Sequence, residues 1–418
     1  MLVFSLSLAS IMKNIIVQKF GGTSVGSPER LQAVARRVVA SVEQGHAMVV
    51  VVSAMGKTTD ELVGLAKQIS SDPNPREYDA LVSTGENVSA SLLAMAIQAL
   101  GRDAISLTGY QAGIYTETRY SKAKILDIKP ERILRELEKD RVVIVTGFQG
   151  VNEASDVTTI GRGGSDTSAV ALASALGCSE CDIFTDVEGV YTTDPRVVSD
   201  ATKLIEISYD EMLELASLGA KVLHPRAVEC AKENDVVLHV RSSFDTVEGT
   251  RVKEAKHMEV NRVVTGVTMK DNEAIVSIIG VQDRPGIAGK LFSTLSDVGI
   301  NVDMIIQSTD EDQLNNITFT VIKDDLKEAV AITQGVADDI GAERVDSDED
   351  VCKVSIVGVG MISKPGVAAK MFEVLGKKGI NIKLISTSEI KVSCAISSSE
   401  GQHAVRLLHD AFSLDTLS

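Results

Sequence analysis

A lysine and three glycines stand together near the start of the chain, in the segment Lys19 to Gly26. The apolar run Ile15 to Val17 before it is typical of a short buried strand, and a helix can begin at Ser27 to Arg30. A strand, a glycine-rich turn and a helix present backbone N–H groups and the positive end of a helix to an anion. Adjacent glycines let the backbone approach a phosphate, and Lys19 adds a positive charge. The segment therefore predicts a phosphate-binding turn.

A second glycine-rich segment, Thr158 to Ala169, contains Arg162 and lies directly before an alanine-rich helical pattern. The fork of an arginine binds both oxygens of a carboxylate, which suits an acidic substrate. Residues Ser165 to Thr167 are good helix-capping residues, so a capped helix with a flexible lead-in is the structural alternative. If Asp166 paired with Lys19, each charge would lower the cost of placing the other in the site.

Two further segments have competing interpretations. Ser83 to Glu86 has the spacing of a capping box, in which Ser83 caps a helix and Glu86 returns a hydrogen bond. The segment Gly56 to Thr58 suggests a Walker A phosphate loop, but that motif needs a glycine where Val51 stands. The Walker A interpretation is therefore excluded, whereas the capping box stays open.

From Lys13 onward, the chain resembles the aspartate kinases of the amino acid kinase family. The resemblance rests on segments in the expected order: Lys19 to Gly26, Ser53 to Asp60, Ser83 to Glu86, Thr158 to Ala169 and Phe184 to Arg196. It implies transfer of the γ-phosphoryl group of ATP, with Mg²⁺, to the β-carboxylate of L-aspartate. That step, giving 4-phospho-L-aspartate, begins the biosynthesis of lysine, threonine, methionine and diaminopimelate. A carboxylate is already ionised at pH 7, so catalysis would consist of positioning and charge neutralisation.

The resemblance also implies roles for single residues. Lys19 would hold the transferring phosphate, Asp166 would orient Lys19, and Glu86 and Arg162 would hold the amino-acid head group. The other implied substrate-binding residues are Thr58, Thr59, Asp60, Glu61, Gly163, Gly164 and Ser165. The implied ATP-binding residues are Lys19, Phe20, Gly21, Gly22, Ser53, Thr185, Asp186, Tyr191, Asp194, Pro195, Arg196, Lys221 and Val222. No residue is assigned as a metal ligand, and His224 is expected to be structural.

A larger fold must position these segments. Residues from about 13 to 245 alternate apolar runs with helical patterns, which predicts an α/β sandwich with a mostly parallel central sheet. Besides the first strand, the expected strands are 48–52, 142–145 and 236–240. The expected helices are 30–44, 89–100, 131–139, 168–176 and 209–234.

An internal repeat follows the polar stretch Ser242 to Asn261, because Asp283 to Ser308 aligns without gaps with Ser363 to Ser388. Each copy has the pattern strand, Pro-Gly turn, helix, Gly turn, strand, which resembles a pair of ferredoxin-like βαββαβ ACT domains. A duplicated module without a ligand is the alternative. The expected parts are an N-terminal extension (1–12), a catalytic domain (13–245), a linker and joining strand (246–266) and two ACT domains (267–345 and 346–418).

The ACT resemblance implies feedback by lysine, threonine or both, and the sequence leaves the choice open. The implied effector contacts are Asp283, Arg284, Pro285, Gly286, Ile287, Ala288, Asn301, Val302, Asp303, Gln307, Val367, Ala368, Asn381, Ile382, Ser388 and Glu389. Residues Val263 to Val267 are expected to join the second repeat. We also expect a homo-oligomer through the ACT domains, and a start at Met258 could yield a separate regulatory subunit. The acidic segment Asp346 to Asp350 lacks the glycine and glutamate of a calcium loop and is expected to be a solvated linker.

Composition narrows the class of protein. The net charge of −16 argues against a broad nucleic-acid surface, which needs clustered positive charge. Cys178 and Cys181 form a lone CxxC, so neither a zinc site nor a redox motif is expected, and the cysteines suit the cytoplasm. The apolar stretch Met1 to Met12 lacks the basic region of a secretory signal and is too short to span a membrane, so it is expected to be an extension, with Met12 as an alternative start.

Two other functions stay open at this point. The catalytic half could act on another small acid, such as glutamate or N-acetylglutamate, or the chain could be an amino-acid sensor with an inactive kinase domain. The repeats and the segment Lys19 to Gly26 favour aspartate over another acid. The complete set Lys19, Glu86, Arg162 and Asp166 argues against an inactive domain.

Overall fold

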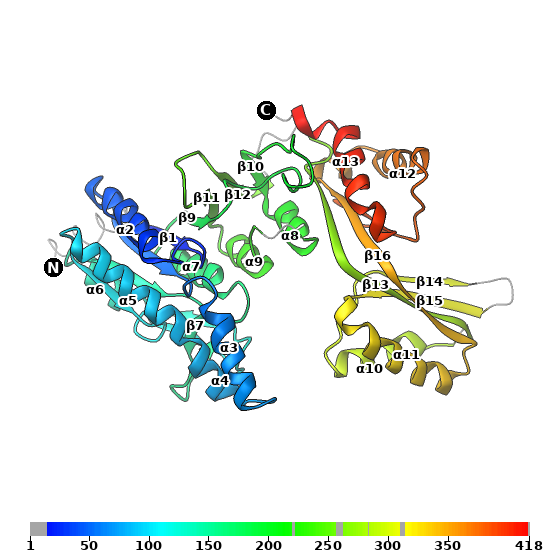
Figure 1. Cartoon of the computed structure of the whole chain (residues 1–418), viewed down its shortest axis with the longest axis horizontal. Helices are drawn as coiled ribbons and strands as arrows, with labels where there is room; N and C mark the ends of the chain where they lie inside the picture. The colour runs from blue at the N-terminus through cyan, green and yellow to red at the C-terminus, as the bar shows by residue number, and fades with distance from the viewer. Residues whose placement is uncertain (1–14, 220–221, 256–261, 283, 310–313, 417–418) are drawn as a thin grey trace. The chain divides into compact units, whose positions relative to one another are not determined.

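The computed structural model describes residues 15–219, 222–255, 262–282, 284–309 and 314–416 (Figure 1). The chain divides into two compact units. The first contains Met1–Val190, Lys203–Ser217 and Lys221–Val260. The second contains Tyr191–Thr202, Leu218–Ala220 and Asn261–Ser418.

The first unit is built on an eight-stranded sheet with the order β10-β12-β11-β9-β1-β2-β6-β3. Its strands pair in parallel except for β11 with β12, so the sheet is mostly parallel. The strands are β1 (Ile15–Phe20), β2 (Ala47–Val52), β3 (Ala104–Leu107), β6 (Val142–Thr146), β9 (Glu180–Thr185), β10 (Glu206–Ser208), β11 (Val237–Ser242) and β12 (Thr250–Lys253). A four-stranded sheet contains β4 (Ile114–Thr116), β5 (Ile125–Ile128), β7 (Gln149–Val151) and β8 (Val157–Thr159).

Helices cover both faces of the central sheet. The helices of this unit are α2 (Pro28–Glu43), α3 (Thr58–Ile69), α4 (Pro75–Val82), α5 (Thr84–Ala99), α6 (Glu131–Leu137), α7 (Gly164–Ala175), α8 (Tyr209–Ser217) and α9 (Pro225–Glu233). Apolar side chains of α2 and α5 pack on β2 and β6 in one core, whereas α7 packs against β1, β2 and β9. A strand buried on both faces is apolar throughout, which is why Met48–Val52 is a continuous apolar run.

One helical stretch of the described chain, Pro75–Ala99, is long and apolar enough to cross a membrane by length and composition. Half of its most apolar window is buried inside the unit, where α5 packs against α2, β3 and β6. Core helices of folded domains commonly have this character, because one side of the helix supplies the core.

The second unit contains both repeats in one six-stranded antiparallel sheet, ordered β14-β15-β13-β16-β18-β17. Its strands are β13 (Gly266–Gln282), β14 (Ile305–Thr309), β15 (Leu314–Val321), β16 (Arg344–Val357), β17 (Leu384–Thr387) and β18 (Lys391–Ile396). Its helices are α10 (Ile287–Asp297), α11 (Leu326–Ile340), α12 (Val367–Lys377) and α13 (Gly401–Ala411), with 3₁₀ turns at Lys323–Asp325, Val359–Ser363, Ser398–Glu400 and Leu414–Thr416. The long strands β13 and β16 pair with each other and run through both repeats.

Residues from two other parts of the sequence join the second repeat. Val264, which precedes β13, and Val267, at its start, belong to the same core as α12 and α13. The segment Tyr191–Thr202 also lies in this unit and adds Val198 to that core. Its Thr192 hydroxyl hydrogen-bonds Nε2 of the buried His409 at 2.9 Å, and the Thr192 carbonyl accepts from the Val267 N–H at 2.8 Å.

Two expectations about local structure are wrong. The helix predicted over 209–234 is two helices, α8 and α9, because Gly219 has φ +117° and Pro225 begins a new helix, where its missing N–H is harmless. The predicted acidic linker Asp346 to Asp350 is part of β16. Its carboxylates are held locally, since Asp348 pairs with Lys383 at 2.8 Å.

Candidate active site

The two glycine-rich segments lie at the carboxyl edge of the central sheet. β1, β2 and β9 are parallel neighbours, so the residues that follow them share one edge, which is where parallel sheets bind ligands. The Gly21 N–H donates to the carbonyl of Phe184 at 3.2 Å, and the Ser53 N–H donates to that of Phe20 at 3.1 Å. These bonds fix the three strand ends relative to one another.

At Gly22 there is no room for a side chain. A Cβ there would lie 2.8 Å from the carbonyl oxygen of Ala54. The Gly22 carbonyl also accepts a hydrogen bond from the Gly56 N–H at 3.0 Å. The turn after β1 is therefore packed tightly against the turn after β2, and any substitution at Gly22 would push them apart.

The structure brings Lys19 and Asp166 together from segments 147 residues apart in the sequence. Nζ of Lys19 lies 2.5 Å from Oδ1 of Asp166, and the two side chains are only 11% and 13% exposed. A Cβ at Gly21 would lie 3.4 Å from the same Nζ, so the ammonium stands beside the glycine turn. The attraction between two opposite charges this close offsets part of the cost of sheltering each of them from water.

The loop before α7 has an unusual backbone. Gly161 and Gly163 have φ +86° and +72°, and α7 begins without a side-chain cap, so the structural alternative of a helix capped by Ser165 to Thr167 does not hold. A Cβ at Gly163 would lie 2.2 Å from the ring of His224, which explains the glycine. The side chain of Arg162 is exposed. The Gly164 N–H donates to the Gly161 carbonyl at 2.9 Å, which closes the loop onto the start of α7.

His224 serves the structure of this region. Its Nδ1 accepts a hydrogen bond from the Arg226 N–H at 3.3 Å and thereby caps α9. Burial lowers the pKa of His224, which favours the neutral ring that such a bond requires.

Glu86 is a buried carboxylate with few hydrogen bonds to offset the cost of its burial. It is 3% exposed, and its Oε1 accepts a hydrogen bond from the Ala54 N–H at 3.1 Å. Its Oε2 has no hydrogen-bond partner among the described residues. Burial raises the pKa of Glu86 to about 7. The capping box is not formed, because the Ser83 hydroxyl donates instead to the Ala80 carbonyl.

Other predicted site residues surround this edge. Thr58 packs near Gly85, beside Glu86, and with Thr59, Asp60 and Glu61 it forms the first turn of α3. The rings of Phe20 and Phe184 stack with centroids 4.7 Å apart, and the Thr185 hydroxyl donates to Asp186 at 3.1 Å. Val222 is half-buried, whereas Lys221 lies outside the described residues.

Four residues predicted to bind ATP belong to the second unit: Tyr191, Asp194, Pro195 and Arg196. The Arg196 guanidinium donates to both oxygens of Asp194, at 3.0 and 2.7 Å, and these bonds lower the pKa of Asp194. Their nucleotide contact stays a prediction.

The predicted effector residues gather at equivalent places in the two repeats. Gly286 and Gly366 precede α10 and α12 with φ +94° and +93°, and a Cβ at either would meet no atom within 4 Å. The space beside each of these glycines is therefore open, at the point where a helix begins with N–H groups that have no partner within the helix. Asp283 lies outside the described residues. The rest stand at the same turns (Arg284, Pro285, Ile287, Ala288, Val367, Ala368), after the helices (Asn301, Val302, Asp303, Asn381, Ile382) and on or after β14 and β17 (Gln307, Ser388, Glu389).

Sequence reasoning missed two charged residues that hold the loop before α7. Asp79, fully buried in α4, accepts hydrogen bonds from Ser121 and Thr159. Arg226 donates to the carbonyl of Ile160 at 2.5 Å. The sequence did contain a signal for Asp79. Its spacing from Val82 and Glu86 places this charged residue on the side of the helix that is buried.

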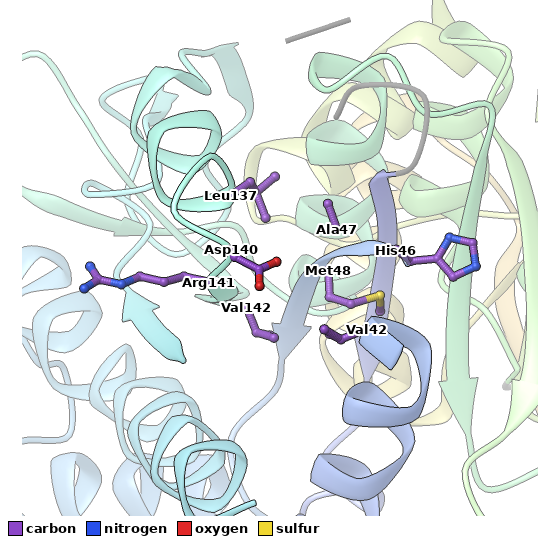
Figure 2. Close-up of a pocket in the computed structure, with 8 residues that line it drawn as sticks. All are labelled: Val42, His46, Ala47, Met48, Leu137, Asp140, Arg141 and Val142. Atoms are coloured by element: carbon purple, nitrogen blue, oxygen red, sulfur yellow. The ribbon is translucent and has the colours of Figure 1, made fainter. Parts of the chain in front are cut away.

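A small pocket elsewhere is unrelated to this site. Figure 2 shows its lining residues, which are Val42, His46, Ala47, Met48, Leu137, Asp140, Arg141 and Val142. Ala47 and Val142 begin β2 and β6, so the pocket is at the amino edge of the sheet. None of the predicted site residues lines it.

Comparison with known proteins agrees with this geometry. The family model for the amino acid kinase family matches residues 14–242, and two ACT domain models match 274–340 and 354–412. The chain is 54% identical to aspartokinase 2 of Bacillus subtilis (strain 168) over 96% of its own length and 98% of that protein. The chain belongs to the aspartokinase family. The expected family, paired ACT domains and α/β fold class are thereby confirmed.

Other members of the aspartokinase family are similar over nearly their whole length. The aspartokinase of Geobacillus stearothermophilus is 54% identical, with 96% of this chain and 97% of that protein covered. The crystal structure of E. coli aspartokinase III in complex with aspartate and ADP (R-state) has a TM-score of 0.79 at 27% identity, covering 95% of this chain and 99% of that chain. The same enzyme in complex with lysine and aspartate (T-state) has a TM-score of 0.75, covering 96% and 99%.

Proposed function

We propose that this chain is an aspartate kinase, which transfers the γ-phosphoryl group of ATP to the β-carboxylate of L-aspartate and so begins a branched route of amino-acid biosynthesis. Membership in the aspartokinase family supports the reaction. The observation that carries it is the pairing of Lys19 with Asp166 beside the Gly21-Gly22 turn. Lys19 would neutralise the transferring phosphoryl group, and Asp166 would keep the ammonium of Lys19 in place.

The proposed aspartate site uses the carboxylate that has an unpartnered oxygen. The free oxygen of Glu86 would receive the α-ammonium of aspartate, which supplies the missing positive charge in a buried place. Arg162, exposed in the loop before α7, would bind the α-carboxylate. Residues Thr58 to Glu61 and Gly163 to Ser165 would complete the site, and the attacking β-carboxylate needs no base because it is already ionised.

ATP would bind at the same edge, together with Mg²⁺. The proposed nucleotide contacts are Phe20, Gly21, Gly22, Ser53, Thr185, Asp186, Lys221 and Val222. For Tyr191, Asp194, Pro195 and Arg196, contact with the nucleotide is proposed from the family resemblance alone. Mg²⁺ prefers oxygen ligands and usually takes one or two carboxylates besides phosphates and water. The exposed carboxylate of Asp186 fits that requirement. When bound, the ion would neutralise charge on the phosphates.

Regulation is proposed for the two ACT repeats, with lysine, threonine or both as effectors. The open helix starts at Gly286 and Gly366 support this, because their N–H groups suit the carboxylate of an amino acid. We further propose the domain boundaries given above, a cytoplasmic location and a homo-oligomer through the ACT domains. A second product starting at Met258 is also proposed; that residue lies outside the described part of the chain.

An assay of ADP release tests the proposal. The full chain is incubated with ATP, Mg²⁺ and, in turn, L-aspartate, L-glutamate and N-acetylglutamate, each with and without lysine and threonine. ADP release that depends on aspartate is expected, together with inhibition by at least one effector. Release that depends on another acid would overturn the choice of substrate, and no release with any acid would overturn the kinase assignment.

A further inference from the structure

Asp79 is a fully buried carboxylate in α4 to which the proposed reaction gives no role. Its Oδ2 accepts hydrogen bonds from the backbone N–H of Thr159 at 2.7 Å and from that of Ser121 at 2.9 Å. Its Oδ1 accepts from the hydroxyls of the same two residues, at 2.9 and 3.2 Å. Hydrogen bonds to an ionised acceptor are strong, so Asp79 is a firm junction between α4 and two distant segments.

Both partners of Asp79 adjoin the loop that carries Arg162. Thr159 ends β8 two residues before Gly161. The carbonyl oxygen of Ser121 lies 2.9 Å from the place of a Cβ on Gly161. Ser121 itself has φ +65°, an unfavourable conformation for a residue with a side chain, which its hydrogen bonds to Asp79 help to maintain. Asp79 therefore fixes where the loop begins.

The same helical stretch also carries Glu86. Ser83, between α4 and α5, has helical backbone angles, φ −66° and ψ −16°, so Pro75–Ala99 is nearly continuous. Asp79 and Glu86 are seven residues apart, which places them on one face of the helix, and both are buried. The stretch thus links the carboxylate proposed for the α-ammonium to the loop proposed for the α-carboxylate.

We infer that Asp79 is a positioning residue that sets the separation between Glu86 and Arg162. The inference rests on the proposed function, in which these two groups bind the head group of aspartate. The ammonium and carboxylate of an amino acid are attached to one carbon, so their separation is fixed, and the site must match it. Asp79 holds no residue proposed for ATP, so its loss falls on aspartate binding and not on nucleotide binding.

Asp79→Ala is the main test, with steady-state kinetics of the full chain. The KM for aspartate is expected to rise about 10- to 100-fold, because a displacement of about 1 Å at a substrate contact can cost that much. The KM for ATP is expected to stay within about twofold. A change in folding alone would reduce the amount of active enzyme and leave both KM values unchanged.

Asp79→Asn is the conservative variant that should restore binding. Its amide oxygen can take the two backbone N–H bonds, and its NH₂ group can donate to the Ser121 and Thr159 hydroxyls, which rotate to accept. The KM for aspartate is therefore expected within about threefold of the wild-type value. If Asp79→Ala does not fold, Thr159→Val removes one of the hydroxyl bonds and should raise the KM for aspartate about 2- to 5-fold.

A matched control separates positioning from general stability. Glu136 in α6 is also buried, at 1% exposed, and is held by Arg132, Lys139 and Arg141. Glu136→Ala should lower thermal stability and leave both KM values unchanged. An unchanged KM for aspartate in folded Asp79→Ala, or in Thr159→Val, would overturn the inference while leaving the kinase assignment intact. A wild-type chain without aspartate-dependent ADP release would overturn the proposed function instead.

Discussion

The two sides of the candidate site treat buried charge in opposite ways. On the phosphate side, the ammonium of Lys19 is matched by Asp166 at 2.5 Å. On the head-group side, Glu86 is just as sheltered, yet one of its oxygens has no partner among the described residues and its pKa is raised to about 7. In the first arrangement the two opposite charges are already paired before any ligand arrives, whereas in the second the opposite charge would come from the ligand.

This difference separates two uses of charge in one site. A pre-paired cation needs no reorganisation when the charge of the transition state develops, which favours rate. An unpaired buried carboxylate is energetically unfavourable, and a cation that binds beside it removes part of that cost. Such a group therefore favours the binding of a cation and selectivity for it. Changes on the phosphate side should therefore act on kcat, and changes on the head-group side on the KM for aspartate.

Lys19→Met should have the largest effect. It removes the positive charge at the phosphate side, and we expect kcat to fall about 10²- to 10³-fold, the usual result of deleting one transition-state contact. Initial rates at saturating ATP and aspartate measure this. Lys139→Met, in the turn after α6, is the matched control and should leave kcat unchanged. A kcat near the wild-type value in the Lys19 variant would remove the contrast between the two sides.

Arg162→Ala should have the next largest effect, and it should change the KM for aspartate instead of kcat. Losing a charge-assisted pair of hydrogen bonds to the α-carboxylate should raise the KM for aspartate about 10- to 100-fold. The KM for ATP should change little. Arg132→Ala, an exposed arginine of α6, serves as the control. Equal changes in both KM values would count against a contact specific to aspartate.

The raised pKa of Glu86 predicts a pH dependence. Below about pH 7 the free enzyme holds this group protonated, and a protonated carboxyl attracts the α-ammonium poorly. We expect kcat/KM for aspartate to fall up to about tenfold per pH unit below pH 7 and to level off above it. Glu86→Gln should have a low and flat profile. A wild-type profile that is flat between pH 5.5 and 8 would contradict the unpaired state.

The last prediction concerns stability and not kinetics. Because the pKa of Glu86 in the folded state exceeds its ordinary value of 4.5, the folded chain binds more protons than the unfolded chain between about pH 4.5 and 7. Its contribution to stability is full below pH 4.5 and is lost as pH rises to 7. Glu86→Gln should therefore gain stability relative to wild type from pH 5 to pH 8, by at most about 3 kcal/mol. Urea denaturation at both pH values measures the gain.

The sequence predicted the parts of this fold that depend on local pattern. Continuous apolar runs such as Met48 to Val52 identified buried strands, and the aligned repeat identified two similar modules. The pairing of Lys19 with Asp166 needed the family resemblance, because no local pattern links residues so far apart. The break between α8 and α9 was missed, since the helical period continues while Gly219 and Pro225 end it.

Features that depend on long-range packing could not be predicted. Ser83 and Glu86 have the spacing of a capping box, but Glu86 is drawn to the Ala54 N–H of another turn. In the sequence, Asp79 is one of many carboxylates. Its four hydrogen-bond donors come from Ser121 and Thr159, which only the folded structure brings to it. In both cases the hydrogen-bond donor comes from a segment that is distant in the sequence, so the local spacing of residues cannot predict it.

The segment Tyr191–Thr202 limits where truncated or chimeric versions of this protein can be joined. It precedes the apparent domain boundary by about fifty residues, yet its Val198 fills the core around α13, and its Val197 carbonyl accepts a hydrogen bond from Arg406 at 3.0 Å. A chimera joined near residue 246 would exchange an incomplete regulatory module and leave His409 opposite a foreign sequence. A regulatory chain starting at Met258 would lack residues 191–202 and with them the contacts of Val197 and Val198. Successful grafts must therefore transplant residues 191–202 together with the repeats.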